Sequence, residues 1–165
     1  MDLALVTASE AIATLAEARA YYLGKLAMAH KITCRNAEVT IVFEREGTHL
    51  FSEEVPDFNA IPNEMLVTRN IGGGRREVRQ FCIDRARLMD RVLPAISAFT
   101  HCTRGQGAPS RSPRLMTGPR LACGRYMRVI LRPGPDTAWT CLTAFPIDEM
   151  AYRECCRASP TRFPS

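Results

Sequence analysis

The pattern that most restricts the fold is a β-hairpin near the C-terminal end of the sequence. Two strand-like runs, Tyr126–Arg132 and Ala138–Phe145, flank the sequence Pro-Gly-Pro-Asp at positions 133–136. Proline and glycine in this arrangement are typical of a tight turn, and β-branched and aromatic residues are typical of the strands beside one. The sequence therefore predicts two antiparallel strands here, and the fold must contain a β-sheet.

Helical periodicity appears in two earlier segments. Apolar side chains recur every three to four positions in residues 8–31, with Ser9 as the expected N-cap, and again in residues 75–99. The remaining faces of the second segment carry arginines, which are usually solvated in such a position: Arg76, Arg79, Arg85, Arg87 and Arg91. We predict two amphipathic helices and a short closing helix at Ile147–Cys156.

The segments between them are interpreted as one strand pair and two irregular stretches. Residues 37–44 alternate in polarity as a strand does, and residues 48–52 are expected to return beside them after a turn at Glu46 and Gly47. Residues 53–74 are expected to be mostly irregular, with one helical turn near 63–67 and a flexible triple-glycine connector at 72–74. Residues 103–124 concentrate glycine, proline, serine and arginine, which predicts a long loop.

Length and composition set the fold class. A chain of 165 residues with 46% apolar and 24% charged residues can bury one core. We predict a single domain over 1–165 of the α+β class, in which N-terminal helices precede a small antiparallel sheet that ends in the hairpin. No apolar run is long enough to span a membrane. The seven cysteines lack the spacing of a disulfide framework, so a reducing, cytoplasmic location is expected.

The net charge of +5 is carried mainly by arginine, whose planar guanidinium suits phosphate recognition. RNA is the expected partner, although a basic composition alone favours nucleic acid only weakly. The sequence contains no phosphate-binding loop, GxSxG elbow, HExxH pair or CxxC zinc motif, so we predict neither a metal nor another cofactor. The arginines expected to contact the RNA backbone are Arg104, Arg111, Arg114, Arg125 and Arg128.

Several polar residues are of the kinds that a metal-free ribonuclease uses. Attack by the 2′-hydroxyl needs a base for its proton, an acid for the leaving 5′-oxygen, and a cation or hydroxyl for the phosphate. His49 follows a turn, His101 opens the arginine-rich segment, and Thr143 interrupts the last apolar strand. Each has a structural role as its alternative, and His30 is expected to be structural. The ribonuclease interpretation requires His49, His101 and Thr143 to meet in one positively charged groove.

A resemblance to a known family strengthens this interpretation. The hairpin Arg125–Ile147, closing on Thr-Ala-Phe-Pro at 143–146, resembles the terminal hairpin of the RNase A-like toxin domains of bacterial contact-dependent inhibition proteins. Gly-Thr-His-Leu at 47–50 looks like the family's entry motif, Met65–Arg69 like its L-L-x-R segment, and residues 75–96 stand where its A-E-R-A helix stands. The wider group of barnase, EndoU, colicin and RelE-like ribonucleases has N-terminal helices followed by an antiparallel sheet.

This resemblance implies active-site roles for Thr143 and Arg69, with His49 as general acid or base. Two positions depart from the family: its second histidine is replaced by Glu54, and its tyrosine by Phe145. Glu54 would then replace an imidazole as base and His101 would supply the acid. In the assignment that we adopt, His49 and His101 share the acid–base work. Thr143, Arg69 and Arg128 position or neutralise the scissile phosphate. The expected function is a metal-independent endoribonuclease, a toxin or toxin-like effector with a cognate immunity or antitoxin protein. The alternatives are a catalytically inactive RNA-binding or partner-binding module on the same scaffold, and an adaptor whose arginine-rich loop binds an acidic partner.

Overall fold

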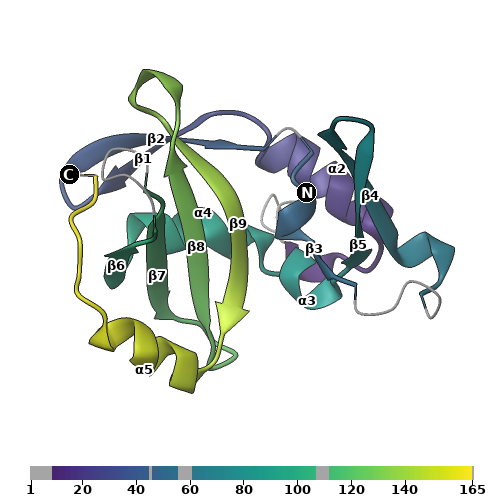
Figure 1. Ribbon diagram of the computed structural model, residues 1–165. Helices are drawn as coiled ribbons and strands as arrows, with labels where there is room; N and C mark the ends of the chain where they lie inside the picture. Colours follow the sequence, from purple (N-terminus) through teal and green to yellow (C-terminus); the bar gives the residue numbers. More distant parts are fainter. Residues whose placement is uncertain (1–8, 45, 56–60, 107–111, 165) are drawn as a thin grey trace, which may run out of the picture.

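The computed structural model describes residues 9–44, 46–55, 61–106 and 112–164, and it has an α+β architecture with two sheets (Figure 1). A six-stranded sheet has the order β1-β2-β9-β8-β7-β6, and a three-stranded sheet has the order β3-β5-β4. All neighbouring strands are antiparallel except β2 and β9, which are parallel. The strands are β1 (His30–Cys34), β2 (Ala37–Phe43), β3 (Ser52–Glu54), β4 (Leu66–Gly72), β5 (Arg75–Phe81), β6 (His101–Arg104), β7 (Arg114–Arg120), β8 (Tyr126–Pro133) and β9 (Trp139–Ile147).

The helices are short. The α-helices are α2 (Leu15–Lys25), α3 (Ile83–Ala86), α4 (Val92–Ser97) and α5 (Glu149–Arg157), and the 3-10 turns are η1 (Ser9–Ala11), η2 (Thr48–Leu50), η4 (Asn63–Met65), η5 (Met89–Arg91) and η6 (Pro135–Thr137). None of the helices in the described ranges is long and apolar enough to cross a membrane. The α+β class is therefore confirmed, but a single α-helix, not several, precedes the first strand among the described residues, and the larger sheet is mixed.

The helix predicted over 8–31 is wrong at both ends. Helix α2 begins after Thr14, whose side chain accepts a hydrogen bond from the Glu17 backbone N–H at 3.2 Å. Ser9, the expected N-cap, belongs to η1 and donates to the Arg87 carbonyl at 2.8 Å. His30 already starts β1, which pairs with β2. The strand predicted at 37–44 is confirmed, but its hairpin partner precedes it in the chain, and η2 occupies the segment where a returning strand was expected.

The helix predicted over 75–99 is the largest error. Its first third is strand β5, which pairs with β4, and the short helix α3, the turn η5 and the short helix α4 follow. The triple glycine is not a flexible connector but the turn of this hairpin, with φ of 92°, 62° and 72° at Gly72, Gly73 and Gly74. Positive φ values are accessible to glycine without the steric strain that a Cβ would cause.

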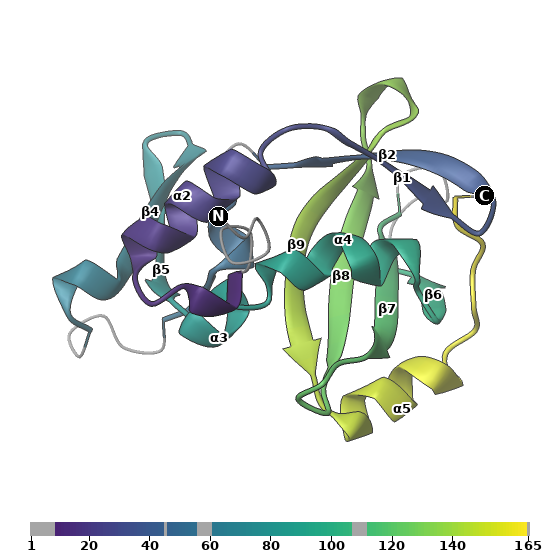
Figure 2. The ribbon, with the colours of Figure 1, turned by 180° about the vertical axis from the view of Figure 1, so that it is seen from behind.

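The segment 103–124 also differs from its prediction, since β6 and β7 pair within it. The C-terminal hairpin is confirmed as β8 and β9, and the closing helix as α5, which Asp148 caps by accepting from the Ala151 backbone N–H at 2.8 Å. Figure 2 shows α4 lying across one face of the larger sheet. Met116, Val129 and Ala144 lie opposite one another in the register of β7, β8 and β9, and all three are buried. Thr143 and Phe145, the neighbours of Ala144 on β9, project from the other face of the sheet.

Candidate functional site

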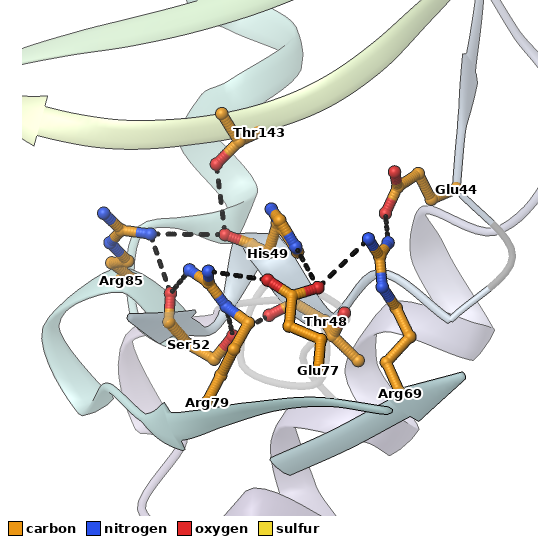
Figure 3. Close-up of polar contacts among 9 residues, drawn as sticks. All are labelled: Glu44, Thr48, His49, Ser52, Arg69, Glu77, Arg79, Arg85 and Thr143. Atoms are coloured by element: carbon orange, nitrogen blue, oxygen red, sulfur yellow. Dashed lines mark hydrogen bonds and ion pairs between the residues drawn. The ribbon is translucent and has the colours of Figure 1, made fainter. Parts of the chain in front are cut away.

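A cleft of about 500 Å³ opens where β9 faces the three-stranded sheet. Its lining comes from η2, β3, β5, α3 and β9, and consists of His49, Glu53, Glu54, Glu77, Arg79, Arg85, Thr143 and Phe145. Figure 3 shows the β5 side chains pointing up toward β9, with His49 between them. The two sheets thus bring together polar residues from five separate elements.

His49 reaches this cleft because the chain turns sharply just before it. Gly47 has φ 62°, and a Cβ at this position would overlap the Tyr22 ring of α2. Tyr22 is buried, so helix α2 packs directly on the turn. The next residues form η2, and the Ser52 hydroxyl donates to the Thr48 carbonyl. The glycine and the tyrosine together fix the direction in which the His49 imidazole leaves the backbone.

Glu77 anchors the His49 imidazole. Its Oε2 lies 3.2 Å from His49 Nε2. Burial alone would raise the pKa of the Glu77 carboxyl, but the hydrogen bond and charge of His49, with Arg69 and Arg79, outweigh it and hold this pKa below its usual value. An ionised carboxylate only accepts hydrogen bonds, so Nε2 carries a proton. The other ring nitrogen is directed away from Glu77 (Figure 3) and remains available for proton transfer.

Arg69 supports Glu77 and does not face the open part of the cleft. Its Nη1 lies 2.6 Å from Glu44 Oε2 and its Nη2 lies 3.1 Å from Glu77 Oε2. The guanidinium is thereby engaged by two carboxylates. The resemblance implies that Arg69 acts at the active site. In the structure Arg69 contacts Glu77, which in turn contacts His49, so Arg69 holds the carboxylate that orients the imidazole.

Arg79 is similarly engaged. It donates from Nε to the Ser52 hydroxyl at 2.8 Å, from Nη2 to the Ser52 carbonyl at 3.0 Å, and from Nη1 to Glu77 Oε1 at 3.3 Å. Its side chain is only 8% exposed. Arg79 therefore holds β3 against β5 and forms the floor of the cleft.

Arg85 is the cation with free donors. Its Nη1 donates to the carbonyl oxygens of Ser52, at 2.7 Å, and His49, at 3.4 Å. Within the described residues no carboxylate pairs with it, and no hydrogen bond uses its Nε or Nη2. Burial lowers the pKa of this guanidinium. A partly buried cation that no described carboxylate pairs with, beside an imidazole, is suited to bind an anion such as a phosphate.

Thr143 and Glu54 also reach the cleft, as expected from the sequence. The Thr143 hydroxyl donates to the His49 carbonyl at 3.2 Å, so β9 is fixed against η2. Glu54 is exposed on β3, opposite Arg79 in the strand register, and forms no ion pair with any described residue. His49, Thr143 and Glu54 therefore line one site.

The structure does not bring His101 to this cleft. It lies on β6, with its Nδ1 3.8 Å from Cys156 Sγ and its ring edge-on to Tyr152 of α5. Three strand spacings separate β6 from β9, which is roughly 14 Å. The expected meeting of His101 with His49 is thus not found. His30 has structural contacts, with its Nε2 3.2 Å from the Leu26 carbonyl and its ring edge-on to Phe43.

The arginines expected to bind RNA are dispersed. Arg104 and Arg125 are exposed, and Arg111 lies outside the described residues. Arg114 is buried at 5% exposure, donates to Ser112 and stacks over Trp139 at 5.4 Å, because its segment is strand β7 and not a loop. Arg128 lies directly opposite Phe145 on β8.

Three residues of the site were missed from the sequence: Glu77, Arg79 and Arg85. The helix prediction placed the two arginines on a solvated face. The missed signal was the alternation within Arg75–Phe81, since Glu77, Arg79 and Phe81 share one face of a strand. The cleft is also less positive than expected, because it combines three glutamates with two arginines and one histidine.

No protein-family model, no curated protein and no solved structure matches the chain. The functional interpretation of the cleft therefore rests on its own residues.

Proposed function

We propose that the chain is a metal-independent endoribonuclease that cleaves RNA by attack of a 2′-hydroxyl on the adjacent phosphate. One observation carries the proposal: the imidazole of His49, anchored at Nε2 by Glu77, shares a cleft with the unpaired guanidinium of Arg85. An oriented proton-transfer group and a cation for the phosphate are two of the three parts that this reaction requires, and a base for the 2′-hydroxyl proton is the third.

The roles divide between His49 and Glu54. Among the cleft residues that the structure describes, His49 carries the imidazole, the side chain that most often serves as a general acid or base. His49 is therefore assigned as the acid that protonates the leaving 5′-oxygen through its free ring nitrogen. Glu54 is assigned as the base that removes the 2′-hydroxyl proton. The new bond joins the 2′-oxygen to phosphorus, the bond to the 5′-oxygen breaks, and the product carries a 2′,3′-cyclic phosphate.

The phosphate is held by Arg85, whose Nε and Nη2 can donate to two phosphate oxygens at once. Thr143 keeps β9 at hydrogen-bond distance from the His49 backbone, so the imidazole and the strand move together. Arg69 and Arg79 are positioning residues, because both hold the Glu77 carboxylate that orients the imidazole.

The experiment is digestion of total RNA by the purified protein in EDTA, with analysis of the product ends. Products ending in 2′,3′-cyclic phosphate support the proposal. His49→Gln should lower the rate by about 10²-fold or more, the usual contribution of a general acid. His101→Gln is the matched control, since its imidazole lies outside the cleft, and it should cleave normally. Intact RNA with every variant would overturn the proposal.

The second candidate is a non-catalytic RNA-binding or partner-binding module. It is favoured by the lining of the cleft, whose described residues include one histidine and not the two that the family resemblance implies. A module of this kind retards RNA in a gel without cutting it. The logarithm of its affinity for RNA should fall linearly with the logarithm of the salt concentration. A module that binds an acidic protein instead should not retain RNA.

The proposal includes the role of a toxin or toxin-like effector in a cytoplasm. All seven cysteines are free thiols, which suits a reducing compartment. A ribonuclease of this kind endangers the cell that makes it, so a cognate immunity protein that covers the cleft is part of the proposal. Co-expression with neighbouring small genes and recovery of a stable complex would identify that partner.

A further inference from the structure

A partly buried aromatic ring, that of Phe145, lies beside the proposed phosphate site. Thr143 and Phe145 are two residues apart on β9, so their side chains project from the same face about 7 Å apart. Ala144, between them, projects from the opposite face, and both Ala144 and its β8 partner Val129 are buried. Phe145 therefore belongs to the open side of the sheet and to the cleft lining.

Cationic side chains flank this ring. The Arg85 guanidinium carbon lies over one face of the Phe145 ring, 5.3 Å from its centre, so a base would stack on the other face. Arg128 is directly opposite Phe145 in the β8–β9 register, and such pairs have their Cβ atoms about 5 Å apart. Arg128 is partly exposed, and its Nη1 contacts Cys155 Sγ of α5 at 3.4 Å. No other aromatic ring of the described residues stacks on Phe145.

We propose that Phe145 is a stacking platform for one unpaired base of single-stranded RNA, with the neighbouring backbone phosphate bound by Arg128. This inference rests on the proposed function for the location of the scissile phosphate at Arg85. An aromatic face alternating with guanidinium groups is the arrangement by which proteins bind single-stranded nucleic acid. One RNA strand leaving the reaction centre would then place its scissile phosphate at Arg85, a base on Phe145 and the neighbouring phosphate at Arg128.

The chemistry of the platform defines the substrate class. A phenyl ring has no hydrogen-bonding group, so it accepts any base face and reads no base edge. The base must nevertheless leave its stack to reach the ring, which excludes a base held in a duplex. The substrate is therefore single-stranded or looped RNA, with little sequence preference at this position.

The test measures binding without cleavage. A fluorescent 2′-O-methyl octanucleotide lacks the attacking hydroxyl, and a series of such strands carries one abasic position each. Fluorescence anisotropy at low salt gives Kd for the wild type, for Phe145→Leu, which keeps apolar volume without a ring, and for Phe145→Trp, which keeps a ring. Stacking of one base contributes enough affinity for about a tenfold change in Kd.

The expected result is that one abasic position weakens wild-type binding about tenfold, that Phe145→Leu weakens binding to the intact strand equally, and that the two changes together cost no more than either alone. Phe145→Trp should bind as tightly as the wild type. Equal abasic penalties in wild type and Phe145→Leu, or no binding by the wild type, would overturn the platform. Cleavage is scored separately on unmodified RNA. If RNA is cleaved and cleavage depends on His49, but the abasic position and Phe145→Leu weaken binding independently, the platform alone is wrong. If the two changes are not additive but no RNA is cleaved, the ribonuclease proposal alone is wrong.

Discussion

The Thr143 hydroxyl donates a hydrogen bond to the His49 backbone carbonyl at 3.2 Å, across 94 positions of sequence. The same carbonyl accepts from Arg85 Nη1 at 3.4 Å. These two contacts attach η2, and with it the imidazole, to strand β9 on one side and to helix α3 on the other. The position of His49 is thus fixed through its backbone, while Glu77 fixes its ring.

Thr143→Val should therefore weaken both stability and cleavage. A hydrogen bond of this kind contributes about 1 kcal/mol net to the free energy of unfolding, and valine preserves the shape and strand propensity of threonine. Thr143→Ser keeps the hydroxyl and should retain the activity. Urea denaturation and single-turnover cleavage measure the two effects. Equal activity in the valine and serine variants would show that the hydroxyl does not position His49.

Glu77→Gln should change the pH dependence of stability. The folded pKa of Glu77 lies below its ordinary value of 4.5, so its contribution is complete above that pH and is lost as the pH falls through the folded value. The variant should be less stable than wild type at pH 7, and the difference should shrink toward pH 3. Urea denaturation at both pH values measures this. Glu38→Gln, at an exposed position of β2, is the control, and a difference for Glu77→Gln that is independent of pH would contradict the ion-pair network.

Arg85→Gln should reduce the salt dependence of RNA binding. Removal of one phosphate contact lowers the slope of log affinity against log salt by about 1. Arg76→Gln is the matched control, because Arg76 is exposed on the opposite face of β5. Anisotropy titrations at several salt concentrations give the slopes. A slope unchanged by Arg85→Gln, or changed equally by both variants, would place the phosphate elsewhere.

Local signals were sufficient for the C-terminal hairpin but not for residues 75–99. The turn at 133–136 specifies its own geometry, and strands β8 and β9 follow from it. In Arg75–Phe81, by contrast, Val78 and Phe81 fit a helical period while Glu77, Arg79 and Phe81 fit a strand period. Seven residues support both patterns, and pairing with β4 decides between them. That pairing is a tertiary contact that the local pattern does not contain.

The candidate site was also only partly predictable, because some of its residues carry a local signal and others reach the cleft through tertiary contacts. His49, Thr143 and Glu54 were identified from their types and from the family resemblance, and all three line the cleft. Arg79 and Arg85 were lost with the incorrect helix over 75–99, because its periodicity placed both arginines on a solvated face. His101 was misplaced because its position depends on the order of strands in the larger sheet, which no local pattern in the sequence specifies.

Arg114→Ala should affect stability and leave RNA binding unchanged. The guanidinium is buried over Trp139 and donates to Ser112 at 2.9 Å, so its removal takes away charge-assisted hydrogen bonds and packing together. The expected loss is about 2 kcal/mol in the free energy of unfolding. Arg104→Ala, at an exposed position of the neighbouring strand, should stay within about 0.5 kcal/mol of wild type. Weaker RNA binding by folded Arg114→Ala would show that this residue reaches the ligand.

Gly47→Ala should be the most damaging of three glycine substitutions. Gly24 lies within α2 with nothing within 4 Å of an added Cβ, so alanine should stabilise the protein by about 0.5–1 kcal/mol. Gly73 has the same φ as Gly47, 62°, but open surroundings, and alanine there should cost about 1–2 kcal/mol of backbone strain alone. At Gly47 the added Cβ also overlaps the Tyr22 ring, which adds a further 1–3 kcal/mol. Thermal and urea unfolding of the three variants separate these terms. Because Tyr22 packs on the turn before His49, Gly47→Ala should also lower cleavage under conditions where the variant remains folded. Equal losses in the free energy of unfolding at Gly47 and Gly73 would show that Tyr22 moves aside and does not determine where the imidazole lies.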